Sequence, residues 1–216
     1  EKEISMSELT FYTHPMSRGR VVRWMLEEVG IPYTVETMDF GPDMKTPEYL
    51  AINPMGKVPA IKHGSTIVTE VAAICAYLAD QFPDKKLAPP AASPERGAYY
   101  RWLFFMAGPF EMATSALAHG WKIDSTNVQA VGCGRVEDSI NTLEKVLGKS
   151  PYICGDAFTA ADVLVSSYLW WETMQKNIPP NKVFQEYIQR TESRPAAKRA
   201  NELDDALVES MKAVTA

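Results

Sequence analysis

The sequence predicts two parts of different class, a small α/β domain followed by an all-helical domain. Three observations support this: the first part alternates strand-like and helix-like segments, a proline-rich stretch interrupts it, and the remainder has long amphipathic segments with little β-alternation. We expect the α/β domain over 7–84, a linker over 85–94 and the helical domain over 95–216. The interruption contains Pro83, Pro89, Pro90 and Pro94, a density that no regular element tolerates.

The α/β part has the element order β-α-β-α-β-β-α. The expected elements are, in order, a strand over 9–13, a helix closed by Gly30, a strand over 33–38, a short helix around 47–51, two strands over 58–62 and 65–68, and a helix over 70–81. The last two strands form a hairpin about His63-Gly64, where glycine tolerates the positive φ of a tight turn. Because a hairpin is antiparallel while the first crossover favours parallel pairing, the sheet should be mixed.

The second part repeats apolar residues at helical spacing. The expected helices cover 95–118, 126–147, 160–174, 181–191 and 195–212. Before the third of these, Thr159 and Asp162 form a Thr-x-x-Asp pattern ahead of an apolar run, which is typical of a capping box. We expect this pair to stabilise the fold and to take no part in catalysis.

Composition indicates a globular protein that binds a small molecule. The chain is 46% hydrophobic and 10% aromatic, enough for a sizeable core, and its net charge of -5 disfavours nucleic acid and anionic membranes as partners. No stretch approaches the roughly 20 apolar residues of a spanning helix, and the first residues do not resemble a secretory signal. We therefore expect a cytoplasmic protein.

The cysteines and histidines do not suggest a metal site. Cys75, Cys133 and Cys154 are odd in number and lie in apolar surroundings, which favours reduced thiols over disulfides. Together with the histidines they lack metal-ligand spacing, and no glycine-rich phosphate loop occurs, so we expect neither metal nor nucleotide. Met6 resembles a natural start, which leaves open whether residues 1–5 are native.

Ser17 lies where the first strand gives way to the first helix. Backbone N–H groups and the positive end of the helix dipole favour an anion there, and a serine hydroxyl adds a directed hydrogen bond. A thiolate would be held well at this position. The competing interpretation is a plain N-cap serine, which the residue type alone favours.

A loop runs into the hairpin as Asn53-Pro-Met-Gly-Lys57-Val58-Pro59-Ala. A cis bond before Pro59 would turn the Val58 N–H and C=O toward a bound peptide, although only about 5% to 6% of X-Pro bonds are cis. Lys57 is either a ligand contact or a solvated loop lysine. The loop therefore has both a binding interpretation and a structural one.

Glu70 opens the helix that follows the hairpin. As a first-turn acid it stabilises the helix dipole by a few tenths of a kcal/mol. The functional alternative is that Glu70 binds a ligand ammonium while the N–H of Val71 meets a carboxylate. Both interpretations remain open at this point.

These motifs, in this order and before a helical half, resemble the glutathione transferases. The segments that carry the resemblance are Ser17, Asn53-Pro-x-Gly-Lys-Val-Pro-Ala, Thr69-Glu-x-x-Ala-Ile and the stretch from Tyr152 to Asp162. It covers nearly the whole chain and points to a bacterial-type member with serine at the sulfur-binding position. It implies a thioredoxin-like N-terminal domain followed by an α-helical C-terminal domain, with glutathione on the first domain and the electrophile between the two.

The resemblance also assigns roles by position. Implied are a hydrogen bond from Ser17 to the sulfur, Asn53 and Lys57 near the glycyl carboxylate, Val58 and Pro59 along the cysteinyl backbone, and Glu70 on the γ-glutamyl ammonium. Val71 stands where the family usually has Ser or Thr, so one hydroxyl contact is missing and only the N–H remains. Some bacterial members carry Cys at the Ser17 position; serine forms no mixed disulfide, which favours thiolate stabilisation.

Two other residues compete with Ser17. Tyr12 lies near the end of the first strand, where relatives with a catalytic tyrosine place it, and His14, with an ordinary pKa of about 6.5, is able to assist deprotonation. We rank Ser17 first, Tyr12 second and His14 third. For position and polarisable or aromatic surface, our candidates for the electrophile pocket are Met16, Phe110 and Trp121.

The expected reaction is attack of glutathione thiolate on a hydrophobic electrophile, a detoxifying conjugation. The helix terminus and Ser17 would lower the thiol pKa from about 8.5. Glutathione-dependent peroxide reduction or isomerisation would use the same thiolate and stays open, as does a non-catalytic ligand- or partner-binding module on the same fold. A homodimer is implied by the resemblance.

Overall fold

The computed structural model describes residues 8–215 and divides them into two compact units. One unit holds the chain up to Lys85 together with the residues from Pro195 onward, and the other is Lys86–Arg194. The sequence placed residues 195–216 with the helical half, whereas their helix packs with the first unit. The question about residues 1–5 lies outside the described residues.

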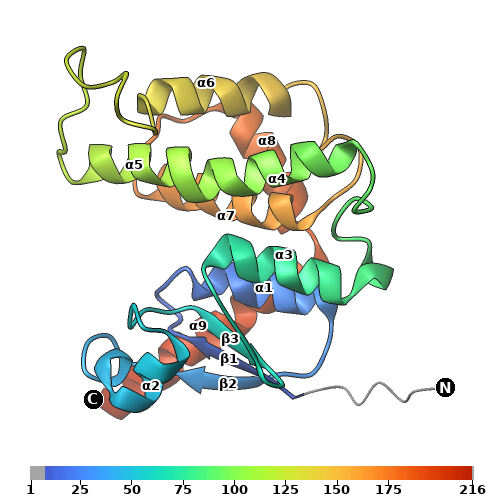
Figure 1. Ribbon diagram of the computed structural model, residues 1–216, viewed down its shortest axis with the longest axis vertical. Helices are drawn as coiled ribbons and strands as arrows, with labels where there is room; N and C mark the ends of the chain where they lie inside the picture. Colours follow the sequence, from blue (N-terminus) through green and yellow to red (C-terminus); the bar gives the residue numbers. More distant parts are fainter. Residues whose placement is uncertain (1–7, 216) are drawn as a thin grey trace. The chain divides into compact units, whose positions relative to one another are not determined.

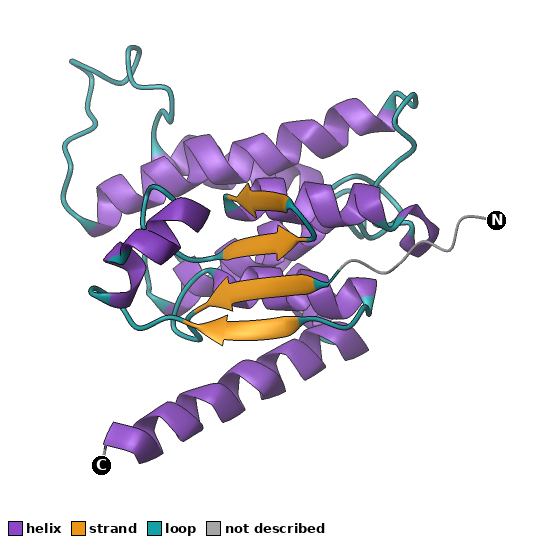
Figure 2. Ribbon diagram, turned by 60° about the horizontal axis from the view of Figure 1, so that its bottom comes forward, coloured by secondary structure: helices purple, strands orange, loops and turns teal. Residues whose placement is uncertain are grey.

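A four-stranded sheet of order β2-β1-β3-β4 forms the centre of the first unit (Figures 1 and 2). Its strands are β1 (Leu9–Thr13), β2 (Thr34–Thr37), β3 (Ala60–His63) and β4 (Thr66–Thr69). β1 runs parallel to β2 and antiparallel to β3, and β3 pairs antiparallel with β4. The predicted mixed sheet is confirmed.

Helices cover both faces of this sheet. α1 (Gly19–Val29) and α3 (Val71–Gln81) pack together on one face, where Phe11 is buried and lies under the guanidinium of Arg23 on α1 (Figure 1). On the other face, the ring of Tyr12 contacts Tyr49 of α2 (Pro47–Ile52), with centroids 5.7 Å apart. Alternation along β1 therefore sends Phe11 and Tyr12 to opposite faces.

The last helix, α9 (Pro195–Thr215), packs along α1. Ion pairs join the two helices, among them Arg23 with Asp204 at 3.0 Å, Arg20 with Asp205 at 2.8 Å, and Arg199 with Glu27. The first is buried, with side chains only 5% and 1% exposed. These contacts explain why α9 belongs to the first unit, and no local pattern in the sequence signals them.

The second unit is helical. Its helices are α4 (Glu95–Phe105), η3 (Met106–Phe110), α5 (Glu111–Ala118), α6 (Val136–Leu147), α7 (Ala160–Met174) and α8 (Lys182–Glu192). The expected helix over 95–118 is interrupted by η3, a π turn that contains Pro109. Proline cannot donate a helical N–H, and a widened turn accommodates this loss.

One expected helix starts later than predicted. The sequence places it over 126–147, but α6 begins at Val136. Before it, the carboxylate of Asp124 accepts hydrogen bonds from the Thr126 N–H and hydroxyl, and Gly134 has a φ of 63°. These local turns compete successfully with the apolar periodicity. Two short 3₁₀ helices, η1 (Asp43–Lys45) and η2 (Pro83–Lys85), occur in the first unit.

Asp162 anchors the start of α7, as predicted. Its carboxylate accepts hydrogen bonds from the Ile153 N–H at 2.8 Å, the Thr159 N–H at 2.9 Å and the Tyr187 hydroxyl at 2.7 Å. Burial raises the pKa of Asp162. The predicted capping box forms and is part of a larger buried network.

All three cysteines are free thiols, in agreement with the sequence. Burial raises the pKa of Cys75 and of Cys154 to about 12. Over residues 8–215, no helix is long and apolar enough to cross a membrane. Within the same described part, no three His, Cys, Asp or Glu residues are grouped so that they could hold a metal ion.

Candidate functional site

Strand register brings three loops to the same end of the sheet. Tyr12, next to the end of β1, pairs with Ala60, the first residue of β3, and Ala60 pairs with Thr69, the last residue of β4. Three segments therefore lie at this end of the sheet: the loop after β1, the segment before β3 and the start of α3. These are the loops that carry Ser17, Val58 and Glu70.

Ser17 lies two residues before the start of α1. Its hydroxyl accepts a hydrogen bond from the Gly19 N–H at 2.9 Å and donates one to the carbonyl of His14 at 2.6 Å. The N–H of Ser17 also donates to the His14 carbonyl, at 3.0 Å. The N-cap residue of α1 is Arg18, so the plain interpretation of Ser17 as the N-cap does not hold. The Ser17 hydroxyl instead satisfies the first N–H of α1 and donates its proton to a carbonyl that already has another donor.

The two rivals of Ser17 have different surroundings. His14 is 8% exposed, its ring lies 4.0 Å from the ring of Phe40, and its Nδ1 accepts the Met16 N–H at 3.1 Å. Burial lowers the pKa of His14, while Asp39 opposes this shift. Burial raises the pKa of Tyr12, and Glu36 adds to the rise. His14 is therefore neutral at pH 7, and Tyr12 keeps its proton.

Asn53 organises the loop before β3. The side chain is 3% exposed; its amide donates to the Lys57 carbonyl at 2.8 Å, and its oxygen accepts the Met55 N–H at 3.1 Å. The Tyr49 hydroxyl donates to the same Lys57 carbonyl at 2.6 Å. Asn53 therefore acts by fixing the loop, while the Lys57 side chain is exposed.

The bond between Val58 and Pro59 is cis. Pro59 is buried and Val58 is half-buried at the entry to β3. The sequence raised this possibility without establishing it. The main chain of Val58 thus has the arrangement that the peptide-pairing interpretation requires.

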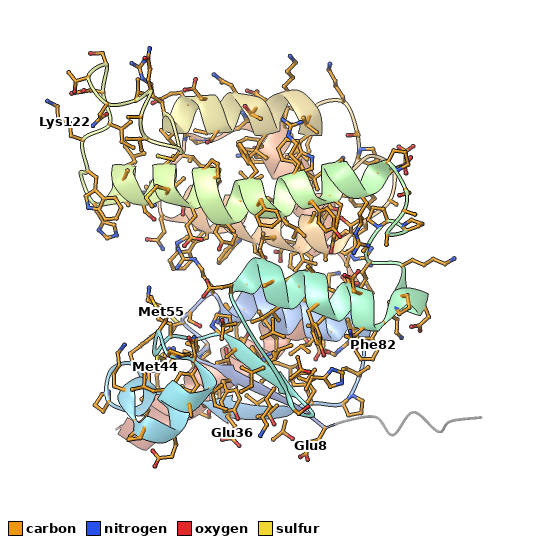
Figure 3. The ribbon with its side chains drawn as sticks, in the orientation of Figure 1. Glu8, Glu36, Met44, Met55, Phe82 and Lys122 are labelled. Carbon is orange, nitrogen blue, oxygen red and sulfur yellow. The ribbon has the colours of Figure 1, made fainter. Side chains whose placement is uncertain are left out.

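Gly56 brings two loops into close contact. It has a φ of 59°, and a Cβ at this position would lie 2.5 Å from the Met44 carbonyl oxygen and 2.7 Å from the Lys45 Nζ. Lys45 in turn donates to the Met55 carbonyl at 3.0 Å. Met44 and Met55 mark the two loops in Figure 3. The contact of Lys45 with this loop was not predicted, because nothing in its local pattern distinguishes it from other loop lysines.

Glu70 has an unusual backbone. Its φ of 71° and ψ of 122° lie where residues with a Cβ are rarely found, and its side chain is exposed at the start of α3. Such backbone strain costs about 1–3 kcal/mol and clusters at functional sites. Val71, which follows, is buried, so an apolar side chain fills the place of the missing hydroxyl. No pattern in the sequence indicated the strained backbone.

The three pocket candidates belong to different units. Met16, in the first unit, is 61% exposed. In the second unit, Trp121 is 56% exposed and stacks on His119, whereas Phe110 is fully buried. The side chain of Phe110 is therefore closed to direct contact with a ligand. The pocket itself stays a prediction.

Comparisons with known proteins identify the family to which the two domains are similar. The glutathione S-transferase N-terminal domain matches residues 16–81, and the corresponding C-terminal domain matches residues 126–171. The chain is 30% identical over 183 residues to glutathione S-transferase GstA of Escherichia coli O157:H7, covering 81% of this chain and 88% of that protein.

Solved structures show the same fold. A glutathione transferase from Methylococcus capsulatus superposes with a TM-score of 0.77 at 27% identity, over 92% of this chain and 99% of the other. A sphingomonad glutathione S-transferase, solved in complex with glutathione, has a TM-score of 0.72 at 26% identity, over 91% and 98%. The architecture is thus the thioredoxin-like domain and helical domain that the sequence predicted. On this evidence, the chain belongs to the glutathione S-transferase family.

Proposed function

We propose that this protein conjugates glutathione to hydrophobic electrophiles, with glutathione bound at the end of the sheet that carries Ser17, Val58 and Glu70. The observation that supports the proposal is the strand register at that end of the sheet, where Tyr12, Ala60 and Thr69 lie in line across three strands. A hydroxyl at a helix start, a strand-like main chain and an acid on a strained backbone therefore converge. The first suits a thiolate, the second a peptide backbone and the third an ammonium.

Ser17 is the residue we propose to stabilise the sulfur. When glutathione binds, the Ser17 hydroxyl turns from the His14 carbonyl to the thiolate and continues to accept the Gly19 N–H. The His14 carbonyl keeps the Ser17 N–H as a donor, so this exchange leaves no buried acceptor unpaired. No acidic residue in the first turn of α1 offsets the helix dipole. Both features lower the thiol pKa.

The reaction is a direct displacement or addition. The thiol proton passes to solvent, and the thiolate sulfur forms a bond to the electrophilic carbon while a leaving group, or the electron pair of a double bond, is displaced. No covalent bond to the enzyme forms. Reduction of peroxides and isomerisation would begin from the same thiolate, and they differ in the electrophile that is offered.

The remaining contacts follow from charge and position. The exposed carboxylate of Glu70 binds the γ-glutamyl ammonium, the Val71 N–H meets the γ-glutamyl carboxylate, and the main chain of Val58 pairs with the cysteinyl residue. Lys57 attracts the glycyl carboxylate, with Asn53 acting through the loop that it fixes. His14 and Tyr12 rank below Ser17, because His14 already accepts the Met16 N–H and Tyr12 packs on Tyr49.

The test is a titration of glutathione at neutral pH, in which thiolate absorbance in the ultraviolet and heat are followed together. We expect thiolate to appear on binding. In Ser17→Ala, turnover with a model electrophile should fall at least tenfold, or about 1.4 kcal/mol, while glutathione affinity stays nearly intact. Ser65→Ala, at an exposed position in the hairpin turn, is the matched control.

The outcomes separate the alternatives. Unchanged turnover in Ser17→Ala would move the role to Tyr12 or His14. Glutathione that binds but stays protonated would favour a non-catalytic binding protein. No binding at all would refute the proposed function while leaving the family assignment intact.

A further inference from the structure

We infer that Arg20 and Asp205 form a positioning pair through which the last helix holds the Ser17 loop in its thiolate-binding conformation. This inference rests on the proposed function, because it concerns the same sulfur site. Neither residue contacts the sulfur. Arg20 and Asp205 act through the backbone on either side of Met16.

Arg20 holds the loop at two points. Its Nε donates to the Pro15 carbonyl at 2.6 Å, and its backbone N–H donates to the Ser17 carbonyl at 3.3 Å. The two accepting carbonyls flank Met16, so one residue of α1 fixes both ends of the short segment that presents the Ser17 hydroxyl. A change in the Arg20 side chain would move this segment.

Asp205 fixes the Arg20 side chain. The Nη2 of Arg20 donates to the Asp205 Oδ1 at 2.8 Å while Nε faces Pro15. A guanidinium is planar and its donors have a fixed fork geometry, so anchoring one nitrogen orients the other. Lysine would supply the charge without this fork. The link from α9 to the Ser17 loop therefore depends on guanidinium shape as well as on charge.

This pair contributes little to the docking of α9. The side chains of Arg20 and Asp205 are 28% and 69% exposed, and exposed ion pairs contribute little to stability. The neighbouring buried pair of Arg23 and Asp204 holds the helices together instead. Removing the Asp205 charge should leave α9 in place.

Arg199 provides a matched control. It also joins α9 to α1, through Glu27, and its side chain is 51% exposed, but its hydrogen bonds are with Glu27 and not with the loop. Arg199→Gln therefore removes an ion pair between the same two helices without touching the Pro15 carbonyl. A general loosening of α9 would affect both variants alike.

Asp205→Ala, which removes both the charge and the acceptor oxygen, separates positioning from electrostatics, because the two predict opposite signs. If Arg20 acted only as a cation near the sulfur, removing the Asp205 charge would expose that cation more fully and lower the pKa of the bound thiol. If the pair positions the loop, the same variant disorders the Ser17 hydroxyl and raises the thiol pKa. Arg20→Lys keeps the charge and should raise it too.

The experiment uses the full chain and two readouts. In the free protein, amide ¹H–¹⁵N shifts of Met16 and Ser17 report the loop; in the complex, the pH midpoint of thiolate absorbance reports the thiol pKa. We expect Asp205→Ala and Arg20→Lys to move both amides and to lower the thiolate fraction at neutral pH by about threefold. Glutathione affinity should stay within about twofold, and Arg199→Gln should match the wild type in both readouts.

The inference would be overturned by wild-type amide shifts in Asp205→Ala, by a lowered thiol pKa in that variant, or by an equal effect of Arg199→Gln. Displaced amides with an unchanged midpoint would also overturn it. If wild-type protein forms no thiolate with glutathione, the proposed function fails and the positioning role fails with it. The amide shifts would then still show whether α9 holds the loop.

Discussion

The first turns of α1 and α7 satisfy their backbone donors in different ways. At α7 the carboxylate of Asp162, fully buried, accepts the Thr159 N–H and two further hydrogen bonds. At α1 the half-buried Ser17 hydroxyl accepts one N–H, and the first turn has no acidic residue. One helix start is neutralised by its own chain, and the other is not.

This difference separates a structural cap from a candidate binding site. A negative charge at a helix start stabilises the dipole, and once the protein supplies that charge an external anion gains little there. The start of α7 is complete without a ligand, whereas the start of α1 retains its attraction for an anion. The type of capping residue therefore matters less than what remains unsatisfied around it.

The largest expected effect tests the completeness of the α7 cap. Asp162→Ala should lower the free energy of unfolding by about 3 kcal/mol, because several buried donors lose a charged acceptor. Asp138, which accepts the Arg135 N–H in the exposed capping box of α6, is the matched control. Asp138→Ala should cost only about 0.5 kcal/mol in urea denaturation. A loss below 1 kcal/mol for Asp162→Ala would contradict the comparison.

A second prediction makes α1 resemble α7. Arg18, at the N-cap of α1, is exposed. Arg18→Asp supplies a carboxylate there, which should raise the pKa of bound glutathione by about one unit, or 1.4 kcal/mol, while leaving stability equal or slightly higher. Arg18→Gln removes the cation alone. If both variants shift the thiolate absorbance profile equally, the lack of a negative charge at the start of α1 is not what lowers the thiol pKa.

A third prediction concerns α3, whose start also lacks an acidic first turn and a side-chain cap. Glu70→Gly should raise the free energy of unfolding by about 1 kcal/mol, because glycine adopts a positive φ without strain, and should abolish measurable glutathione binding. Glu70→Gln keeps the strained backbone and should weaken binding with unchanged stability. Calorimetric titration and thermal unfolding measure both effects. A loss of stability in Glu70→Gly would show that the backbone is not strained.

The smallest effect is a pH dependence at His14. Because burial lowers its pKa, the folded state binds fewer protons than the unfolded state between the folded pKa and about 6.5. Stability therefore rises with pH across that window and is lost as the pH falls through it. His14→Asn, which retains an acceptor for the Met16 N–H, should flatten this slope in urea denaturation at pH 5.5 and 7.5. Equal slopes in the two proteins would argue against a lowered pKa.

Local features were predictable from the sequence. The strand and helix order of the first unit, the mixed sheet and the α7 capping box each depend on residues close together in the chain. In the first unit, glycine and proline marked the turns correctly, and the Asn53–Pro59 segment indicated a specialised loop. The strands and helices of that unit were therefore placed within a few residues, whereas the interruptions at Pro109 and Gly134 in the second unit were missed.

Long-range features were not predictable. Arg23 and Asp204 are 181 residues apart, and no periodicity links them. The role of Asn53 depends on which carbonyl it meets, and the strain at Glu70 depends on the hairpin that precedes it. The site could be named by its residues, but which of them would contact a ligand and which would support a loop required coordinates.

The packing of α9 on α1 has a consequence for the order in which the two units fold. Arg23 emerges early, but the carboxylate that pairs with its 5% exposed side chain lies on the last helix. Domains generally fold as the chain emerges, the N-terminal one first. Because α9 follows the helical unit in the chain, the thioredoxin-like unit cannot complete its packing until that unit has been translated.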